Sequence, residues 1–193
     1  MTGRPRAFDR EAALERAMLA FWKHGYEATS VAMLTEAMGI NAPSMYGAYG
    51  DKRALFGEAL ERYMITYGAF MISTVRDEPD PRTAITRLLL QAAAMFTSSE
   101  HPPGCLMISA ATNCSPQSLE VESRLRGLRA YAIAAMEDKI LRGRRGAAAR
   151  AESHTLALFF EGTLQGMSAL ARDGASKDEL ESVARTALRA WPE

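Results

Sequence analysis

The sequence predicts an all-α fold, and three observations lead to this expectation. Apolar residues recur at spacings of three and four along most of the chain, which is the period of an amphipathic helix. No alternating run of β-branched residues is long enough to indicate a strand. Of the 193 residues, 48% are hydrophobic and 24% are charged, as in ordinary globular proteins, which excludes a disordered or collagen-like chain. We therefore expect about nine packed helices.

The first helix is expected over residues 10–24. Asp9 is a suitable N-cap, because its carboxylate accepts hydrogen bonds from the free N–H groups of the first turn. Apolar residues recur at helical spacing from Ala13 to Trp22, and they define one buried face. Gly25 provides a left-handed C-terminal stop.

Three further helices follow in the first half of the chain. Ser30 begins a short helix that runs to residue 38, where Gly39 interrupts it. Asn41 caps a second short helix that ends near residue 49. Asp51 then caps a longer helix, which we expect to continue over 52–75.

Proline, glycine and capping residues divide the second half of the chain. A charged linker with two prolines at 77–81 ends the fourth helix, and the sequence HPPG at 101–104 ends the fifth. Ser115-Pro116 is a helix-start signal, and Ser176 with Glu179 forms a capping box. The five expected helices span 82–98, 105–113, 117–142, 149–172 and 177–191.

The two short helices at 30–49 have the form of a helix-turn-helix. Gly39 tolerates the positive φ that the turn requires, and apolar residues such as Leu34 and Met45 fall where two crossing helices meet. The first helix supplies the third wall of this core. The remaining positions of the second short helix face away from the core, and they are our candidate DNA-facing positions: Asn41, Ala42, Pro43, Ser44 and Gly47.

These residues resemble the TetR (tetracycline-repressor-like) family of transcriptional regulators. The resemblance covers the whole chain in architecture, and its specific residues lie between Phe8 and Phe56. They are Phe21, Gly25-Tyr26, Thr29-Ser30, Met38-Gly39-Ile40, Met45-Tyr46, Tyr49 and the run from Asp51 to Phe56. The resemblance implies that Tyr46 and Lys52 bind DNA phosphates, and that the start of the recognition helix contacts bases. The DNA-binding candidates on the two short helices and the residue after them are Ser30, Asn41, Ala42, Ser44, Tyr46 and Lys52.

The charge of the N-terminal region departs from that of a strongly basic DNA-binding domain. Residues 1–56 contain seven Lys/Arg and six Asp/Glu, and the whole chain has 23 of each, so its net charge is zero. Non-specific DNA affinity should therefore be modest. We expect Arg4 and Arg6, on an N-terminal arm, to supply positive charge to a narrow minor groove.

An effector site is expected in the C-terminal part, because the resembled family places a ligand cavity there. Methionine and aromatic side chains with a few polar groups suit a small organic ligand, although the same residues at helical spacing also fit an ordinary core. An acid such as Glu161 in an apolar helix must be paired, solvated or protonated. The ligand-binding candidates are Tyr67, Phe70, Met71, Met95, Phe96, Met107, Asn113, Phe159, Glu161 and Gln165.

Two cysteines are too few for a disulfide framework, which favours a reducing compartment. Cys105 follows Gly104 near an expected helix N-terminus, where the helix dipole favours a thiolate, so it is a redox candidate. The alternative is a buried apolar cysteine without chemistry. Cys114 is nine positions away, about 13 Å along one regular helix, which is too far for a disulfide.

Two domains are expected: a helix-turn-helix domain over 1–56 and an effector-binding and dimerisation domain over 57–193. Paired half-sites in DNA require a two-fold protein, so we expect a homodimer through the last two helices. The helix over 52–75 is the expected lever between effector and DNA. The expected dimer residues are Leu156, Phe160, Leu164, Met167, Leu180, Val183 and Leu188.

The sequence thus predicts a homodimeric regulator, a repressor that a small-molecule effector releases from double-stranded operator DNA. The alternatives are a thiol-switched repressor that uses Cys105 and a helical binding protein without specific DNA recognition. The sequence contains no glycine-rich phosphate loop, paired-histidine helix motif or nucleophile elbow, so neither enzyme activity nor a cofactor or metal is expected. It also shows no secretory signal or membrane span, and we expect a cytoplasmic protein.

Overall fold

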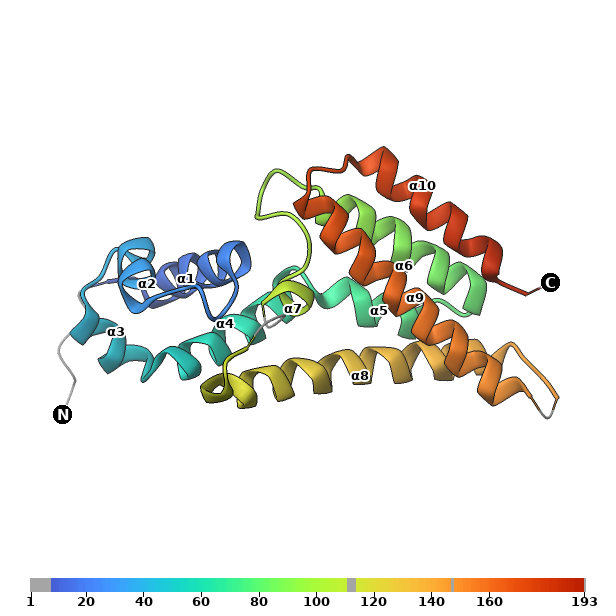
Figure 1. The fold of residues 1–193 in the computed structure, drawn as a ribbon, viewed down its shortest axis with the longest axis horizontal. Coiled ribbons are helices and arrows are strands. Elements are labelled where there is room, and N and C mark those ends of the chain that lie inside the picture. Colours follow the sequence, from blue (N-terminus) through green and yellow to red (C-terminus); the bar gives the residue numbers. More distant parts are fainter. Residues whose placement is uncertain (1–7, 111–113, 147, 193) are drawn as a thin grey trace.

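The computed structural model describes residues 8–110, 114–146 and 148–192. Within these ranges the chain forms ten α-helices and two short 3-10 helices, and no strand, so the all-α prediction is confirmed. The molecule is elongated: α1 to α4 lie at one end, a bundle of longer helices forms the other, and α7 lies between them (Figure 1). The number of α-helices is one more than expected, because one expected helix is divided.

The N-terminal unit contains α1 (Arg10–His24), α2 (Val31–Met38), α3 (Ala42–Tyr49) and α4 (Lys52–Thr66). All four predicted N-caps are confirmed, since each side chain accepts a hydrogen bond from a backbone N–H of its own first turn; they are Asp9, Ser30, Asn41 and Asp51. Gly39 has a φ of +69°, the left-handed conformation that the turn between α2 and α3 requires. Short-range signals therefore set the start of each helix.

Aromatic and aliphatic side chains fill the core of this unit. The ring centroids of Phe21 and Phe56 lie 5.0 Å apart in an edge-to-face arrangement, which joins α1 to α4. Leu34, Met38 and Met45 are completely or almost completely buried, as the helix-turn-helix pattern predicts. The two short helices are thus fixed on a rigid base formed by α1 and α4.

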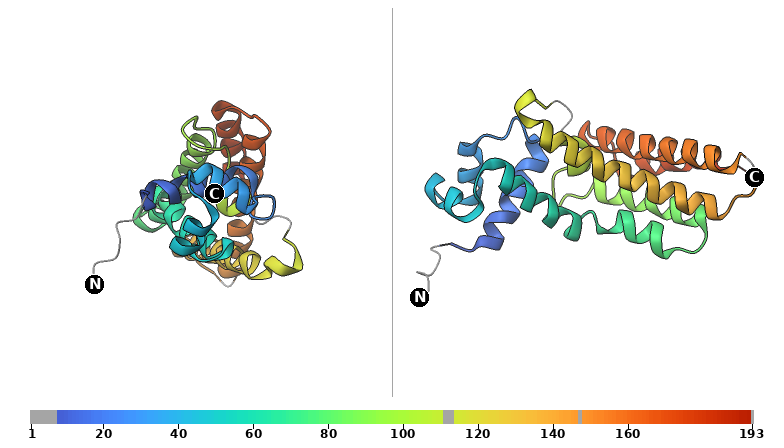
Figure 2. Two further views of the ribbon diagram at one scale, coloured as in Figure 1. Left: turned by 90° about the vertical axis from the view of Figure 1, so that its left-hand side faces the viewer. Right: turned by 90° about the horizontal axis from the view of Figure 1, so that it is seen from below.

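The second unit is a helical bundle. It contains α5 (Ala69–Asp77), α6 (Pro81–Phe96), α8 (Leu119–Arg142), α9 (Ala149–Arg172) and α10 (Lys177–Ala187). The α8 helix packs along α9, and α10 packs against α6 and α9 (Figure 2). The shorter elements are α7 (Leu106–Ser109), η1 (Pro116–Ser118) and η2 (Leu188–Ala190). The capping box of Ser176 and Glu179 at the start of α10 is confirmed.

The expected single helix over 52–75 is wrong, because the chain forms α4 and α5 with a break at Gly68. The N–H groups of Tyr67 and Gly68 both donate to the carbonyl of Tyr63, which ends α4. A Cβ atom at Gly68 would lie 3.2 Å from the Tyr63 ring, so a larger residue there would push against this ring. The proposed lever is therefore shorter than expected and ends at Thr66.

Two other helix ends also differ from expectation. The apolar segment after Gly104 forms only the single turn of α7, and of the expected 105–113 helix, residues 111–113 lie outside the described ranges. The last helix ends at Ala187 and tightens into η2, four residues before the expected end at Trp191. Frayed or tightened final turns of this kind leave little trace in hydrophobic periodicity.

Several contacts join the two units where they meet. The expected domain boundary after Phe56 lies inside α4, so this helix belongs to both. The His101 ring stacks on Trp22 with centroids 4.4 Å apart, and Arg172 at the end of α9 donates to the carbonyl of Trp22. Trp22 is fully buried, and its indole Nε1 has no hydrogen-bond partner among the described residues. The connection is therefore a packed interface.

No helix within the described residues combines the length and apolar character needed to span a lipid bilayer.

Candidate nucleic-acid interface and ligand region

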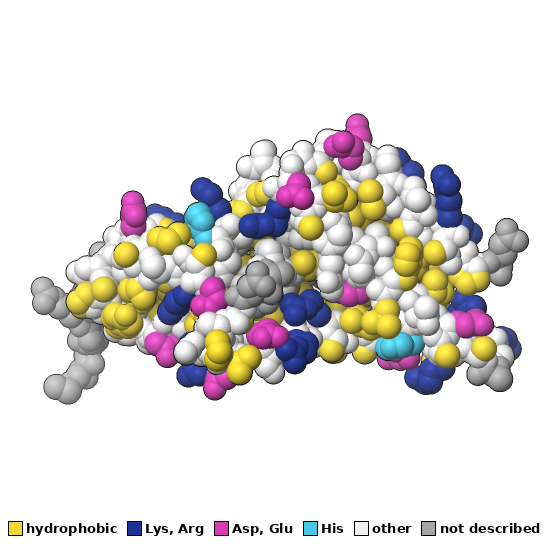
Figure 3. Space-filling view, in the orientation of Figure 1, with side chains coloured by type: hydrophobic (Ala, Val, Ile, Leu, Met, Phe, Trp, Pro, Cys, Tyr) yellow, Lys and Arg dark blue, Asp and Glu magenta, His cyan; other side chains and the backbone are white. Residues whose placement is uncertain are grey.

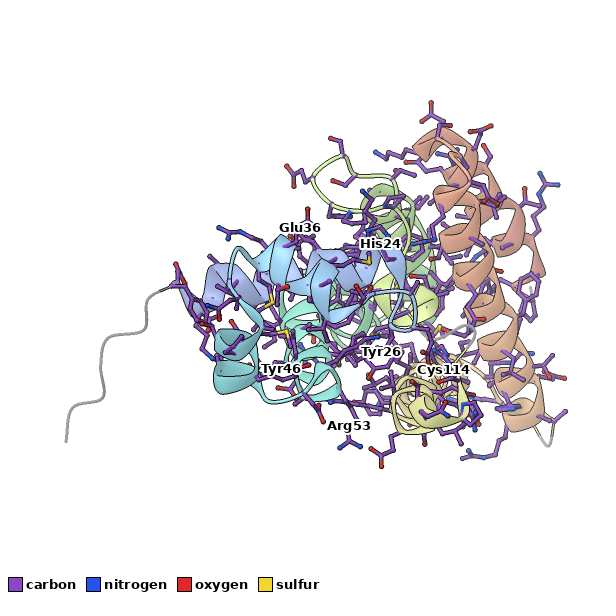
Figure 4. The ribbon with its side chains drawn as sticks, turned by 60° about the vertical axis from the view of Figure 1, so that its left-hand side comes forward. His24, Tyr26, Glu36, Tyr46, Arg53 and Cys114 are labelled. Atoms are coloured by element: carbon purple, nitrogen blue, oxygen red, sulfur yellow. The ribbon has the colours of Figure 1, made fainter. Side chains whose placement is uncertain are left out.

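The α3 helix presents one face to the core and the other to solvent. Met45 and Tyr49 are buried, and the Tyr49 hydroxyl donates to the carbonyl of Arg10 at 2.6 Å, which ties α3 to α1. Tyr46 lies between them in sequence and is 50% exposed. Figure 4 shows its side chain on the outer side of the N-terminal unit. This exposure leaves the Tyr46 hydroxyl accessible to a partner.

The candidate base-contacting residues lie at the start of α3. The Asn41 Oδ1 atom accepts from the N–H of Ser44 at 2.8 Å, so this side chain caps the helix. Ala42 and Ser44 are half-buried, and the exposed Ser30 caps α2 through the N–H of Met33. Two of the candidate DNA-binding residues, Asn41 and Ser30, therefore also serve as helix caps. The predicted contacts of Arg4 and Arg6 lie outside the described residues.

Lys52, the first residue of α4, is held by the loop between α1 and α2. Its Nζ lies 4.4 Å from the centroid of the Tyr26 ring and donates to the carbonyl oxygen of Glu27 at 3.4 Å. Partial burial lowers the pKa of Lys52, which the negative charge of Glu27 partly offsets. The sequence did not indicate these loop partners, because helical periodicity does not extend into a loop.

Basic side chains are sparse on this end of the molecule. Arg53, which follows Lys52, forms an ion pair with Glu120 of α8, and Arg16 donates to the carbonyl of Met38. In the view of Figure 3, hydrophobic and uncharged side chains dominate the left-hand end. This distribution agrees with the small positive charge of the N-terminal segment, in which the half-buried Lys52 and the exposed Arg53 follow α3.

The ligand-binding candidates do not surround a single pocket. Tyr67 packs edge-on against Trp22 at 5.1 Å and donates to Glu15, so it belongs to the contact between the units. Four candidates are buried or half-buried among core side chains, and they are Phe70, Met71, Met95 and Phe96. Phe159, another ligand-binding candidate, differs from these four because it is 44% exposed on α9. Asn113 lies outside the described residues.

Glu161 is the centre of a buried polar cluster. It is 4% exposed, it accepts a hydrogen bond from Gln165 Nε2 at 3.0 Å, and burial raises its pKa. Arg129 of α8 acts on it electrostatically and donates to the carbonyl of Met107 at 2.9 Å. Three ligand-binding candidates, Met107, Glu161 and Gln165, are therefore brought together. None of these residues lines the grooves found on the described surface, and the buried Glu161 lies within the packed bundle.

The redox prediction for Cys105 is not supported by its surroundings. The thiol is completely buried, and burial raises its pKa, which is opposite to the expected effect of a helix N-terminus. The Tyr63 hydroxyl donates to its sulfur at 3.2 Å. Cys114 is half-buried, and both cysteines are free. Because α7 ends at Ser109, the helical distance estimated between the two cysteines does not apply.

The expected dimer stripe is corrected by the structure, because most of it faces the chain's own core. Phe160, Leu164, Met167 and Leu180 are completely buried within the single chain, and Leu156, Val183 and Leu188 are half-buried. The large apolar side chains that remain exposed on α9 are Leu158, Phe159 and Leu170. The outward-facing stripe of α9 is offset from the predicted one by about one residue.

A shallow apolar groove lies between α9 and α10, next to this stripe. Phe159, Thr163, Gly166 and Leu170 line one side at spacings of four, three and four residues, which places them on one face of α9. The α10 side contains Ser182, Val183, Thr186 and Ala187, and Met167 forms part of the floor. Figure 3 shows hydrophobic side chains gathered on this side of the bundle. Phe159 therefore lines an outer groove and not an inner cavity.

Among the residues that the structure describes, no three His, Cys, Asp or Glu side chains are grouped as they would be around a metal ion.

Known proteins share both the sequence pattern and the arrangement of these helices. Residues 13–59 match the family model described as bacterial regulatory proteins, tetR family. The chain is 38% identical over 196 aligned positions to the HTH-type transcriptional repressor ComR of Escherichia coli (strain K12), covering 99% of this chain and 92% of ComR. It is 31% identical to the repressor BdcR of the same organism, covering 96% of this chain and 90% of BdcR.

A solved structure shares both the fold and a substantial part of the sequence. It is the TetR family transcriptional regulator CifR, a cysteine mutant complexed with 26-bp double-strand operator DNA. The two chains superpose with a TM-score of 0.90 and are 40% identical, and the alignment covers 98% of this chain and 100% of the other.

Proposed function

Because this chain belongs to the TetR family of bacterial regulatory proteins, we propose that it is a ligand-responsive transcriptional repressor that binds double-stranded operator DNA. Members of this family are DNA-binding transcription factors and not enzymes. The observation that carries the proposal is the presentation of α3, which two buried residues hold on a rigid base while Tyr46 faces outwards. ComR and BdcR are repressors, and the CifR structure contains operator DNA.

In this proposal, different residues contact the DNA phosphates and the base edges. Tyr46 and Lys52 bind phosphates on either side of the recognition helix, and Asn41, Ala42 and Ser44 approach the base edges. Ser30 at the start of α2 adds a further DNA contact, and the arm arginines Arg4 and Arg6 supply positive charge to the minor groove. The half-exposed Tyr46 and the position of Lys52 at the N-terminus of α4 support these roles, because both lie beside α3.

We further propose that the protein acts as a cytoplasmic homodimer through α9 and α10. The apolar groove and the exposed stripe of Leu158, Phe159 and Leu170 support this proposal, because an apolar helix face of this kind is stabilised by a second copy. A two-fold dimer presents two α3 helices to two half-sites. The proposed interface keeps the helices expected from the sequence and changes the residues that make the contact.

The effector is proposed to bind within the bundle near Glu161. Gln165 donates to this acid, and Arg129, whose charge acts on it, donates to the carbonyl of Met107, so a ligand with a hydrogen-bonding or cationic group would find a partner there. The alternative in which Cys105 is a thiol switch has no support from the structure, since its sulfur is buried and its pKa is raised. The proposed switch is therefore non-covalent ligand binding.

The proposal is tested by selecting DNA fragments from the genome of the source organism and measuring their affinity by electrophoretic mobility shift. Tyr46→Phe is expected to weaken binding to selected and random duplexes by the same factor, because phosphate contacts carry no sequence information. Ser44→Ala is expected to change the preference among operator variants. Failure to enrich any sequence would instead support the helical binding protein without specific DNA recognition.

A further inference from the structure

The loop between α1 and α2 determines where the positive charge of Lys52 lies. The Lys52 ammonium sits above the Tyr26 ring and donates to the backbone carbonyl of Glu27. Tyr26 is almost completely buried, and its own N–H donates to the carbonyl of Ala110 at 2.8 Å. The backbone of this loop is therefore fixed against the segment that follows α7.

The carboxylate of Glu27 is held by hydrogen bonds from the residues just before α8, while its charge still acts on Lys52. Both the N–H and the hydroxyl of Ser115 donate to Glu27 Oε1, each at 2.9 Å. Hydrogen bonds from Ser118 and Ser115 lower the pKa of Glu27, so the group is a carboxylate at neutral pH. Tyr26 and Cys114, both labelled in Figure 4, lie close together in this region. An acid of the N-terminal unit is thus bound by the other unit.

We propose that Glu27 and Ser115 are positioning residues for the contact between Lys52 and DNA phosphate. Ser115 holds the Glu27 carboxylate towards α8 and so leaves the Lys52 ammonium for the DNA. A displacement of residues 115–118 releases the carboxylate, which then pairs with Lys52 in competition with the phosphate. This inference rests on the proposed function, because it requires Lys52 to bind DNA.

Two features make competition the expected result of release. The ammonium already touches the backbone oxygen of Glu27 and interacts electrostatically with its carboxylate, so a rotation of one side chain brings the two charges together. The Tyr26–Ala110 hydrogen bond does not involve Ser115, so the loop backbone keeps its place when the carboxylate is freed. Loss of DNA affinity then follows from charge neutralisation and does not require the loop to unfold.

The test is a set of Ser115 and Glu27 variants of the full chain. Ser115 has a φ of −69°, which proline adopts, so Ser115→Pro removes both of its donors, whereas Ser115→Ala removes only the hydroxyl. Because the Ser118 side chain also hydrogen-bonds Glu27, every variant is made in a Ser118→Ala background and compared with that parent. We expect Ser115→Pro to weaken binding to a genomically selected duplex and to a random duplex about tenfold each, because both contacts are to phosphate. The slope of log affinity against log salt should flatten by about 0.9 per lysine neutralised. Ser115→Ala should shift both values in the same direction by a smaller factor.

Rescue by Glu27→Gln distinguishes competition from structural damage. In the double variants Glu27→Gln/Ser115→Pro and Glu27→Gln/Ser115→Ala, the competing charge is absent, so affinity and salt slope should return to within about twofold of the values of the Ser118→Ala parent. Ser123→Ala, an exposed serine on α8, is the matched control and should have no effect.

Two results would overturn the inference while the wild type still binds operator DNA. One is unchanged affinity in both Ser115 variants. The other is a defect that persists in the Glu27→Gln background. If the wild type selects no DNA at all, the proposed function fails and this inference fails with it.

Discussion

At the scale of single residues, Glu161 contributes a pH-dependent term to stability. Burial raises its pKa above the ordinary value of 4.5, so the folded chain retains a proton that the unfolded chain has lost. The free energy of unfolding therefore decreases as the pH rises above about 4.5 and through the folded pKa. Below this window, the folded and unfolded chains are both protonated at this site and the penalty disappears.

Glu161→Gln is consequently expected to raise the melting temperature at pH 7 by a few degrees and to leave it unchanged near pH 4. Glutamine keeps an oxygen that accepts from Gln165 but carries no charge to desolvate. Thermal melts between pH 4 and pH 8, at one protein concentration, check this expectation. Glu36→Gln, on the exposed surface of α2, serves as the control. A constant difference at every pH would contradict the assignment of the effect to burial.

Gly104 is a second residue whose contribution to stability follows from its surroundings. Its φ is +79°, and a Cβ atom there would lie 2.8 Å from both the carbonyl oxygen and the Oγ of Ser168 on α9. Gly104→Ala should lower the free energy of unfolding by about 3 kcal/mol or more, combining backbone strain with a steric overlap. Gly174→Ala isolates the strain, since Gly174 has a φ of +98° and open space around it. Urea unfolding of both variants measures the difference.

Similar losses in the two glycine variants would show that the backbone around Gly104 shifts freely to relieve the contact.

Part of the candidate site was predictable from individual residues. Asn41 and Tyr46 follow from a capping preference and a family resemblance, because both depend on neighbours within a few positions. The position of the Lys52 ammonium was not predictable, since the two residues that it contacts, Tyr26 and Glu27, lie about 25 residues earlier in a loop. For Cys105 the sequence left two alternatives, a redox cysteine and a buried apolar one, and the burial in the structure agrees with the second. The sequence could not decide between them, because the length of α7 and the packing around it depend on other helices.

At the scale of helices, the starts were easier to predict than the ends and faces. Each N-cap satisfies N–H groups within its own first turn, so Asp9, Ser30, Asn41 and Asp51 could be recognised locally. The division between α4 and α5 occurs where the N–H groups of Tyr67 and Gly68 both donate to the Tyr63 carbonyl, a change of hydrogen bonding that no periodic pattern encodes. The expected length of the lever helix was wrong for this reason, and the structure has ten α-helices where about nine were expected.

The α9 helix shows why the buried face of a helix was harder to predict than its start. It has two neighbouring apolar stripes, one represented by Phe160 and Leu164 in the core and the other by Phe159 and Leu170 at the surface. Apolar spacing of three and four residues indicates that a helix has a buried side, but it does not say which of two adjacent stripes packs inside the chain. The sequence alone therefore indicated an apolar helix and did not separate the stripe that serves the core from the one left outside.

Leu170→Arg should convert the proposed dimer into monomers. A charged side chain in the apolar groove would have to be desolvated on association, and we expect the dissociation constant to rise about 100-fold. Light scattering measures the mass, and circular dichroism checks that the helical fold is retained. Leu119→Arg, on an exposed site at the start of α8, should remain dimeric. A wild-type monomer, or a dimeric Leu170→Arg variant, would contradict the proposed interface.

At the scale of the whole molecule, effector and DNA sites must communicate through the contact between the two units. That contact includes the continuous α4, the Arg172 hydrogen bond to Trp22, and the Ser115–Glu27 hydrogen bonds. An effector in the bundle changes DNA affinity only if it binds one arrangement of the units more tightly than another. The packed contact is the element whose two arrangements would differ.

This two-state account predicts equal reciprocal effects. If the effector weakens operator binding by a given factor, saturating operator DNA must weaken effector binding by the same factor, typically about 5–150-fold. Titration calorimetry of effector binding, with and without saturating operator, measures one side of this cycle. DNA affinity at zero and saturating effector measures the other. Unequal factors at equilibrium would exclude a single pair of conformations.

The arrangement of aromatic rings at this contact also gives the protein an internal optical probe. The chain has two tryptophans: Trp22 is sealed between the units under the His101 ring, whereas Trp191 is half-buried beside Phe160 near the C-terminus. A movement of one unit against the other changes the ring stack on Trp22 and leaves the surroundings of Trp191 intact. In a Trp191→Phe background, the intrinsic emission spectrum of Trp22 therefore reports the arrangement of the two units without an attached dye.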